Sequence, residues 1–203
     1  MNMNTFLRGI IYYIIVPIMV LLILFIVSIF IGNQNKTSQN TNVADIIITS
    51  DFELYDQDNK KVTKADILGS PSVLFFGFTY CPDVCPTTLQ SLSVLIGQLG
   101  ESSKKLKFYF ISVDPERDTP EALKQYLNSF HPAIKALTGD PKQLDILIKS
   151  YSIYAKKVPL ENNNYTMDHT SSLILIDKNT NLVGTITYDE KIDVALAKLK
   201  NLY

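Results

Sequence analysis

A strand built from residues 72–78 (SVLFFGF) is apolar on both faces. Such a strand must be covered on both sides, which is typical of the central parallel strand of an α/β protein. A helix is predicted directly after it, because Pro86 suits a first helical turn and apolar residues recur at helical spacing over residues 89–99. Gly100 is a suitable stop for that helix.

The rest of the chain alternates strand and helix patterns joined by short loops. Further strands are predicted at residues 45–49, 52–55, 61–63, 106–113, 134–137, 173–177 and 182–186, and further helices at 120–130, 141–151 and 192–202. The pattern alone predicts an α/β sandwich. The order of elements matches the thioredoxin arrangement, with an added N-terminal hairpin and one extra helix.

Residues 9–31 contain no charged side chain and are long enough to span a bilayer as a helix. We therefore expect one transmembrane signal anchor at residues 9–31, with a buried core helix as the alternative. Arg8 places residues 1–8 in the cytoplasm by charge bias. Residues 32–43, rich in Asn, Gln, Ser and Thr, are expected to form a flexible linker to a domain at residues 44–203.

Composition narrows the classes of function. The net charge is −1 and no stretch concentrates Lys and Arg on one face, so nothing favours nucleic-acid binding. The chain has only two cysteines, which excludes a structural disulfide framework.

Those two cysteines, Cys81 and Cys85, lie at the predicted strand-to-helix junction with CxxxC spacing. A spacing of four puts both sulfurs on one face of the first helical turn. The helix N-terminus favours thiolates there, so the pair suits either metal binding or redox exchange. Two sulfurs are too few for an iron–sulfur cluster, and two sulfurs with one imidazole fit copper best.

We expect His169 to supply the third ligand, because in a thioredoxin-like sheet the loop before the last hairpin faces the start of the first helix. Asp168 is a candidate to orient that imidazole or to hold a neighbouring loop. His131, the only other histidine, follows a predicted helix and is expected to cap its C-terminal end. Met167 has a thioether that could contact Cu(I), but we expect it to face the core or solvent.

The segment at residues 114–121 packs charges into a loop at the carboxyl end of a strand, where open α/β sheets place functional loops. It is expected either to brace the site or dock a partner, or to be a solvated, salt-bridged turn. The sequence alone leaves these alternatives open.

Four stretches together resemble the Sco/SenC family of copper chaperones for cytochrome c oxidase assembly. They are FGFTYCPDVCP at 76–86, ISVDPERDTP at 111–120, YAKKVP at 154–159 and YTMDHT at 165–170. The resemblance runs from about Asp51 to the C-terminus. It departs at Thr170 and Met167, where many members have serine and an aliphatic residue, and neither departure removes a ligand.

The resemblance implies a thioredoxin-like domain that binds one copper, Cu(I) or Cu(II), through Cys81, Cys85 and His169. It implies delivery to the binuclear copper centre of cytochrome c oxidase subunit II, with another periplasmic copper carrier as a further partner. The expected location is a bacterial inner membrane with the domain in the periplasm, rather than a mitochondrial inner membrane, because no Arg- and Ser-rich presequence precedes the anchor.

Two other functions remain open. A thiol–disulfide oxidoreductase would use Cys81 and Cys85 to reduce the copper-ligand cysteines of the client. A peroxidase or redox sensor would use one cysteine for attack and the other for resolution. His169 separates these alternatives from a copper site, because dithiol chemistry does not require an imidazole.

Overall fold

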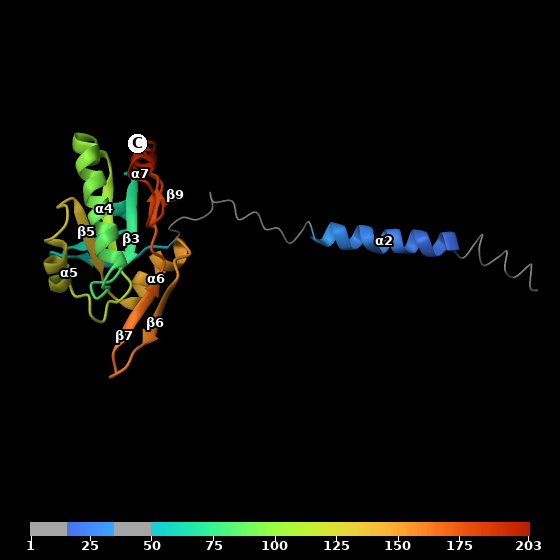
Figure 1. Cartoon of the computed structure of the whole chain (residues 1–203), viewed down its shortest axis with the longest axis horizontal. Helices are drawn as coiled ribbons and strands as arrows, with labels where there is room; N and C mark the ends of the chain where they lie inside the picture. Colours follow the sequence, from blue (N-terminus) through green and yellow to red (C-terminus); the bar gives the residue numbers. More distant parts are fainter. Residues whose placement is uncertain (1–15, 35–49) are drawn as a thin grey trace, which may run out of the picture. The chain divides into compact units, whose positions relative to one another are not determined.

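The computed structural model describes residues 16–34 and 50–203, in two compact units (Figure 1). The first unit contains helix α2 (Val16–Gln34). Within the described ranges, no helix combines the length and the apolar character needed to cross a membrane. The expected cytoplasmic N-terminus, the first part of the predicted anchor, the strand at 45–49 and most of the linker lie outside the described residues.

The second unit is built on a mixed sheet with the strand order β2-β1-β5-β4-β3-β8-β9. Its strands are β1 (Glu53–Asp56), β2 (Lys61–Thr63), β3 (Ser72–Gly77), β4 (Lys107–Ser112), β5 (Ile134–Thr138), β8 (Leu173–Ile176) and β9 (Leu182–Ile186). The three strands β3, β4 and β5 run parallel, while β1 with β2 and β8 with β9 form antiparallel hairpins. The predicted N-terminal and C-terminal hairpins are therefore confirmed.

The helices of this unit are α3 (Lys64–Ile67), α4 (Val84–Leu99), the 3-10 helix η3 (Gly100–Lys105), α5 (Pro120–Leu127), α6 (Pro141–Ser150) and α7 (Ile192–Lys200). Helix α4 packs against α7, α5 packs against β5, and α6 packs against β1. The short α3 and η3 were not predicted. Helix η3 could not be recognised from apolar spacing, because all six of its residues are at least partly exposed and three of them are charged.

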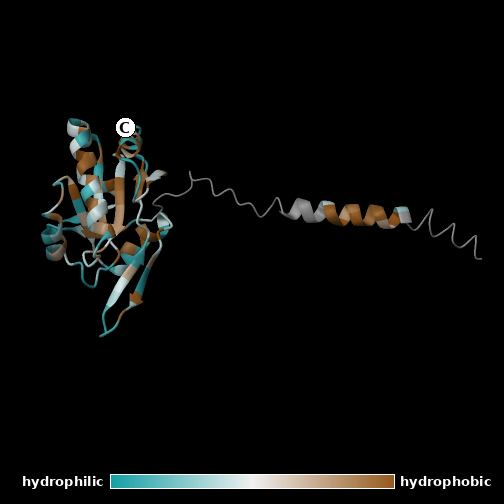
Figure 2. Ribbon diagram, viewed as in Figure 1, coloured by the Kyte–Doolittle hydropathy of each residue, from teal (hydrophilic) through white to brown (hydrophobic). Residues whose placement is uncertain are grey.

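Strand β3 is the centre of the core, as its two apolar faces predict. All six of its residues are buried, with β4 on one side and the antiparallel β8 on the other. The Phe75 and Phe110 rings pack with their centres 5.8 Å apart, which joins β3 to β4 through side chains as well as through the backbone. Within this unit, Figure 2 shows hydrophobic residues along the inner strands, and helix α4 buries Leu89, Leu92 and Ile96.

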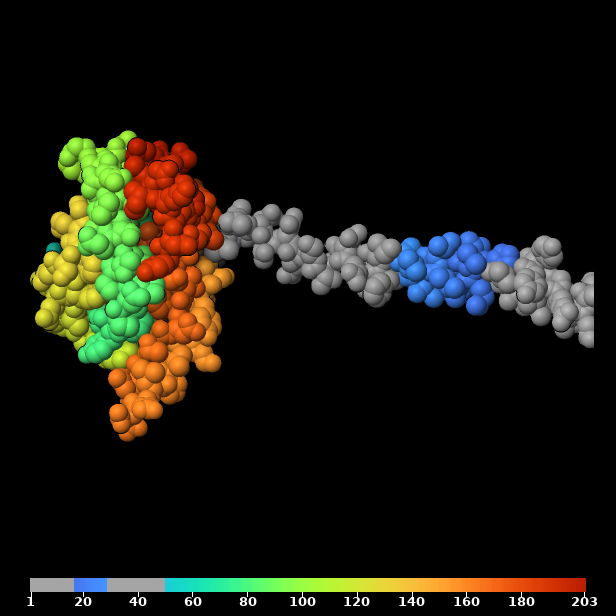
Figure 3. Space-filling model, in the orientation of Figure 1, coloured from blue at the N-terminus to red at the C-terminus, as the bar shows by residue number. Residues whose placement is uncertain are grey.

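A second sheet, which the sequence analysis did not predict, consists of β6 (Ala155–Pro159) and β7 (Tyr165–His169). The two strands are antiparallel, with Ala155 opposite His169 and Pro159 opposite Tyr165. This hairpin protrudes from the domain (Figures 1 and 3). None of its residues is fully buried, so it lacks the apolar alternation that reveals a half-buried strand.

Gly77 ends β3 where α4 approaches the sheet, and no larger residue fits there. A Cβ added to Gly77 would lie 2.6 Å from Cε2 of Phe110 and 2.9 Å from the Cys85 sulfur. Both neighbours are fully buried, so either would have to shift within the packed core. The missing side chain of Gly77 therefore makes space for the Cys85 sulfur.

We predict that Gly77→Ala lowers the free energy of unfolding by about 1–3 kcal/mol, the usual effect of overpacking a core. Gly184→Ala in β9 is the matched control, because its added Cβ meets only Leu175 at an ordinary 3.8 Å. Urea unfolding of both variants measures the difference. Equal stability of Gly77→Ala and the parent would show that the strand can yield at this point.

Candidate metal centre

The first ligand-bearing segment is the junction between β3 and α4, as predicted. Cys81 lies in the loop before α4 and Cys85 is the second residue of that helix. Cys85 is fully buried, whereas Cys81 is partly exposed, and both are free cysteines. The backbone N–H of Cys85 donates to the Cys81 sulfur at 3.4 Å. That sulfur therefore satisfies one of the orphan N–H groups at the start of α4, where the Asp83 side chain makes no cap bond.

The two sulfurs have opposite acid–base behaviour. The hydrogen bond from the Cys85 thiol lowers the pKa of Cys81 to about 3, against the effect of burial and with help from backbone N–H groups. The same hydrogen bond raises the pKa of Cys85, and burial raises it further. The metal-free pair therefore holds one thiolate, on the partly exposed Cys81, and one buried thiol.

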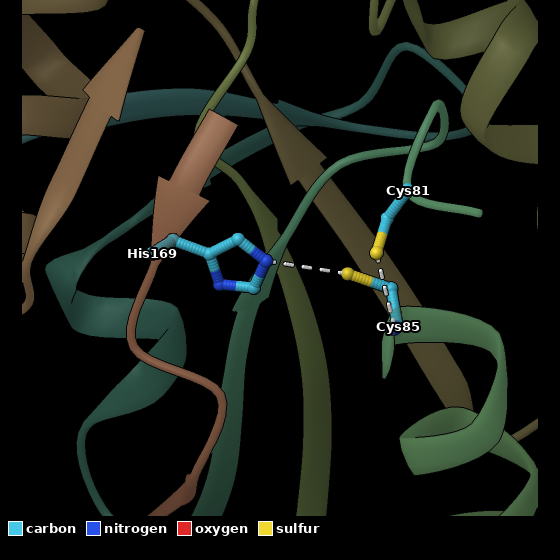
Figure 4. Close-up of side chains that lie close together, drawn as sticks. All are labelled: Cys81, Cys85 and His169. Carbon is cyan, nitrogen blue, oxygen red and sulfur yellow. Dashed lines mark hydrogen bonds between the residues drawn. The ribbon is translucent and has the colours of Figure 1, made fainter. Parts of the chain in front are cut away.

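The second segment is β7, which ends at His169. Nε2 of His169 lies 3.4 Å from the Cys85 sulfur, and the three ligand atoms of Cys81, Cys85 and His169 all lie within 4.8 Å of one another. Figure 4 shows the three side chains pointing toward one another from these two separate segments. The predicted convergence of these residues is present, although His169 ends a strand and does not lie in a loop.

The orientation of the imidazole follows from its other nitrogen. Nδ1 lies 2.9 Å from the carbonyl oxygen of Thr170, which can only accept a hydrogen bond. Nδ1 therefore carries the proton in the neutral ring, and the lone pair of Nε2 points at the sulfurs. The ring also packs edge-on against Phe78, with the ring centres 5.7 Å apart.

Asp168 does not orient this ring, because the hydrogen bond from Nδ1 goes to the Thr170 carbonyl and the Asp168 side chain is exposed. Met167 is partly buried and packs against the core, as expected. The predicted capping role of His131 is wrong. Helix α5 ends at Leu127, four residues earlier, and Nδ1 of His131 accepts a hydrogen bond from the N–H of Ala133.

The charged loop at residues 114–118 is not a solvated turn, because Asp114 and Asp118 are both buried. Asp118 accepts hydrogen bonds from the Thr79 hydroxyl and the Ser112 hydroxyl, both at 2.6 Å, and from the Thr79 N–H. Burial raises the pKa of Asp118, while these hydrogen bonds act in the opposite sense. The carboxylate thus fastens the loop that carries Cys81 to the end of β4.

The donor set suits a soft metal ion. Thiolate sulfur favours Cu(I) and zinc, and neutral imidazole accepts copper as well as zinc. Three donors fall short of the four that close a structural zinc site. Among the described residues, this cluster is the one group of three or more His, Cys, Asp or Glu side chains placed to hold a metal ion.

Comparison with known proteins agrees with this site. The family model described as SCO1/SenC matches residues 40–203. The chain belongs to the SCO1/SenC family. It is 39% identical over 136 residues to the SCO2-like protein RP587 of Rickettsia prowazekii, covering 66% of each chain. It is 35% identical over 162 residues to the mitochondrial SCO1 homolog 1 of Arabidopsis thaliana, covering 79% of this chain and 48% of that protein.

Solved structures of this family share the fold. The structure of Bradyrhizobium japonicum ScoI with copper bound is 44% identical and matches 76% of this chain and 98% of that chain, with a TM-score of 0.71. The crystal structure of yeast Sco1 is 31% identical, covers 75% of this chain and 94% of that chain, and has a TM-score of 0.68. The predicted thioredoxin-like α/β fold is thereby confirmed. The chain spans about half the length of the Arabidopsis relative and two thirds of the Rickettsia one.

We predict that the metal-free protein is alkylated by iodoacetamide at a nearly constant rate from pH 8 down to pH 5. The reason is that Cys81, with its pKa lowered to about 3, stays a thiolate over this range. An ordinary thiol of pKa about 8.5 would slow about tenfold for each unit below that value. The Cys85→Ala variant should lose the constant rate, because it lacks the thiol that stabilises the Cys81 thiolate. A parental rate that falls tenfold per unit from pH 8 would contradict the assignment.

Proposed function

We propose that this protein is a copper metallochaperone that binds one copper ion, Cu(I) or Cu(II), through Cys81, Cys85 and His169. The observation that carries the proposal is the placement of two sulfurs and one imidazole nitrogen within 4.8 Å of one another. Membership of the SCO1/SenC family and the copper-bound structure of the 44%-identical ScoI support copper as the metal. We propose cytochrome c oxidase as the destination, and the binuclear copper centre of its subunit II as the acceptor.

The burial of the ligands suggests how copper would be handed on. Cys85 is fully buried, whereas Cys81 and His169 are both partly exposed. An incoming ligand of the acceptor can therefore approach from the side of Cys81 and His169, and the Cys81 thiolate, the more accessible of the two sulfurs, is exchanged before Cys85. The transfer is a ligand exchange at the metal and needs no net redox change.

We further propose that residues 9–31 anchor the protein in a bacterial inner membrane, with one span and the domain in the periplasm. The charge-free sequence of this segment supports the proposal, and so does the hydrophobic character of α2 (Figure 2). The large apolar side chains of α2 from Ile18 to Val27 are exposed. Extraction of membranes at high pH tests the anchor. Release of the full-length protein into the soluble fraction would count against it.

The placement of the two cysteines also supports a second role, as a thiol–disulfide reductant of the client. In that reaction the Cys81 thiolate attacks a client disulfide, one client sulfur leaves as a thiolate, and a mixed disulfide forms. Cys85 then gives up its proton and attacks the Cys81 sulfur, the mixed disulfide breaks, and the second client sulfur leaves as a thiolate. The two client thiolates take up the Cys85 proton and one proton from water, so the client departs as a dithiol and the protein becomes the disulfide. The two electrons come from the Cys81–Cys85 pair. Failure of the reduced protein to reduce a peptide carrying the copper-ligand cysteines of the client would remove this role.

His169→Ala tests the three-ligand site directly. We predict that it weakens copper binding by more than about 100-fold, beyond the usual loss for an outer-shell partner, because it removes a ligand itself. It should leave the Cys81–Cys85 disulfide able to form, since neither sulfur is changed. Competition with a copper chelator and thiol counting measure the two properties.

His131→Ala is the matched control, because His131 is the other histidine and lies outside the cluster. Its copper affinity should equal that of the parent. A His169→Ala variant that holds copper as tightly as the parent would exclude the imidazole as a ligand.

A further inference from the structure

The hairpin of β6 and β7 carries His169, yet it protrudes from the domain and buries none of its residues fully (Figure 3). Contacts with the rest of the domain must therefore hold the hairpin in the position in which His169 faces the two sulfurs. Outside the hairpin itself, the described contacts of Tyr165 come from the loop at residues 114–118, and Arg117 is at their centre.

Arg117 lies among three aromatic rings. Its guanidinium carbon is 3.7 Å from the centre of the Tyr165 ring, 4.6 Å from that of Tyr80 and 5.9 Å from that of Phe78. Its Nη1 donates to the Tyr165 carbonyl at 3.1 Å. Its Nη2 is buried with no hydrogen-bond partner in the described part of the chain, so cation–π contacts with the rings supplement the single hydrogen bond of Nη1.

Asp114 bonds to both Arg117 and Tyr165. One of its oxygens forms an ion pair with Nε of Arg117, and the other accepts a hydrogen bond from the Tyr165 hydroxyl at 2.8 Å. Asp114 is 3% exposed, so these bonds are shielded from water. We call Arg117, Asp114 and Tyr165 the latch. Lys157 of β6 extends it outward, because its amine pairs with Glu116 at 2.6 Å.

The latch reaches both halves of the metal centre. Tyr80 directly precedes Cys81, and the Phe78 ring packs edge-on against the imidazole of His169. Tyr165 and His169 are the two ends of β7, about 13 Å apart along an extended strand. Pairing with β6 along the whole of β7 makes this strand a stiff connection between the latch and the ligand.

We infer that Arg117 is a positioning residue, which through the latch holds His169 over the sulfurs before copper arrives. A ligand that is already in place loses little conformational freedom on binding, which favours affinity. Opening the latch would withdraw the imidazole and leave copper on the two sulfurs alone. This inference rests on the proposed three-ligand copper site.

The test is a double-mutant cycle on copper affinity with Arg117→Gln and His169→Ala. We expect Arg117→Gln to weaken copper binding about 10- to 100-fold, as the loss of an outer-shell partner does. In the His169→Ala background the same change should have no effect, because the latch acts through the imidazole. Lys124→Gln is the matched control, since Lys124 loses the same charge but pairs with Asp58, outside the latch.

A second readout needs no metal. In the apo protein, amide hydrogen exchange in β7 should be faster in Arg117→Gln than in the parent, while exchange in β3 stays unchanged. Tyr165→Phe keeps the ring over Arg117 and removes the hydroxyl that donates to Asp114 at 2.8 Å and to Glu116 at 3.4 Å. It should therefore give an intermediate copper affinity even if Arg117→Gln unfolds. Arg117→Lys should not restore affinity, because a lysine lacks the planar fork that stacks on Tyr165.

The results that would contradict the positioning role differ from the result that would contradict the three-ligand site. An equal loss of affinity from Arg117→Gln with and without His169 would overturn the positioning role in favour of a general effect on the fold. Parental affinity in both Arg117→Gln and Tyr165→Phe would overturn it as well. Parental affinity in His169→Ala alone would instead overturn the proposed three-ligand site.

Discussion

The metal centre depends on the hydrogen bond between Nδ1 of His169 and the carbonyl of Thr170. This bond leaves the lone pair of Nε2 free and directs it at the Cys85 sulfur, 3.4 Å away. The flanking contacts support the same orientation, because the Phe78 ring packs edge-on against the imidazole. The donor set is therefore assembled by the fold before any metal is present, and a soft cation finds two sulfurs and one nitrogen in place.

The two cysteines share a motif but have different surroundings. Cys85 lies in the space left by the absent side chain of Gly77 and is fully buried, whereas Cys81 is partly exposed and accepts an N–H at the start of α4. The outer sulfur can exchange with a partner while the inner one stays in the core. The same asymmetry serves dithiol chemistry, in which an accessible thiolate attacks and a buried thiol resolves. Copper transfer and thiol reduction are thus compatible with one geometry.

The sequence predicts much of this structure because its strongest signals are local. The two apolar faces of β3, the helical spacing in α4 and the turn between β8 and β9 all correspond to elements that are observed. Cys81 and Cys85 were placed by those elements, and His169 was brought to them by the thioredoxin-like order of strands. The hairpin of β6 and β7 was missed because only Ala155 and Met167 pack against the core, without an apolar alternation, and polar contacts with residues 114–118 hold its Tyr165 end.

The roles of Arg117 and Asp118 could not be predicted from the sequence either. A run of charges at residues 114–121 fits a solvated turn as well as a buried brace, and spacing does not separate the two. Burial in the structure distinguishes the brace from the solvated turn. Asp118 is fully buried against Thr79 and Ser112, and Arg117 stacks on aromatic rings. Such long-range partners become visible only when the strands that carry them are assembled.

X-ray absorption spectroscopy of the copper-loaded protein counts the sulfur and nitrogen atoms bound to copper and so tests the three-ligand site itself. We expect two sulfur scatterers and one imidazole nitrogen, with the imidazole signal absent from the His169→Ala variant. A shell of sulfur alone in the parent protein, or a shell of nitrogen and oxygen without sulfur, would contradict it.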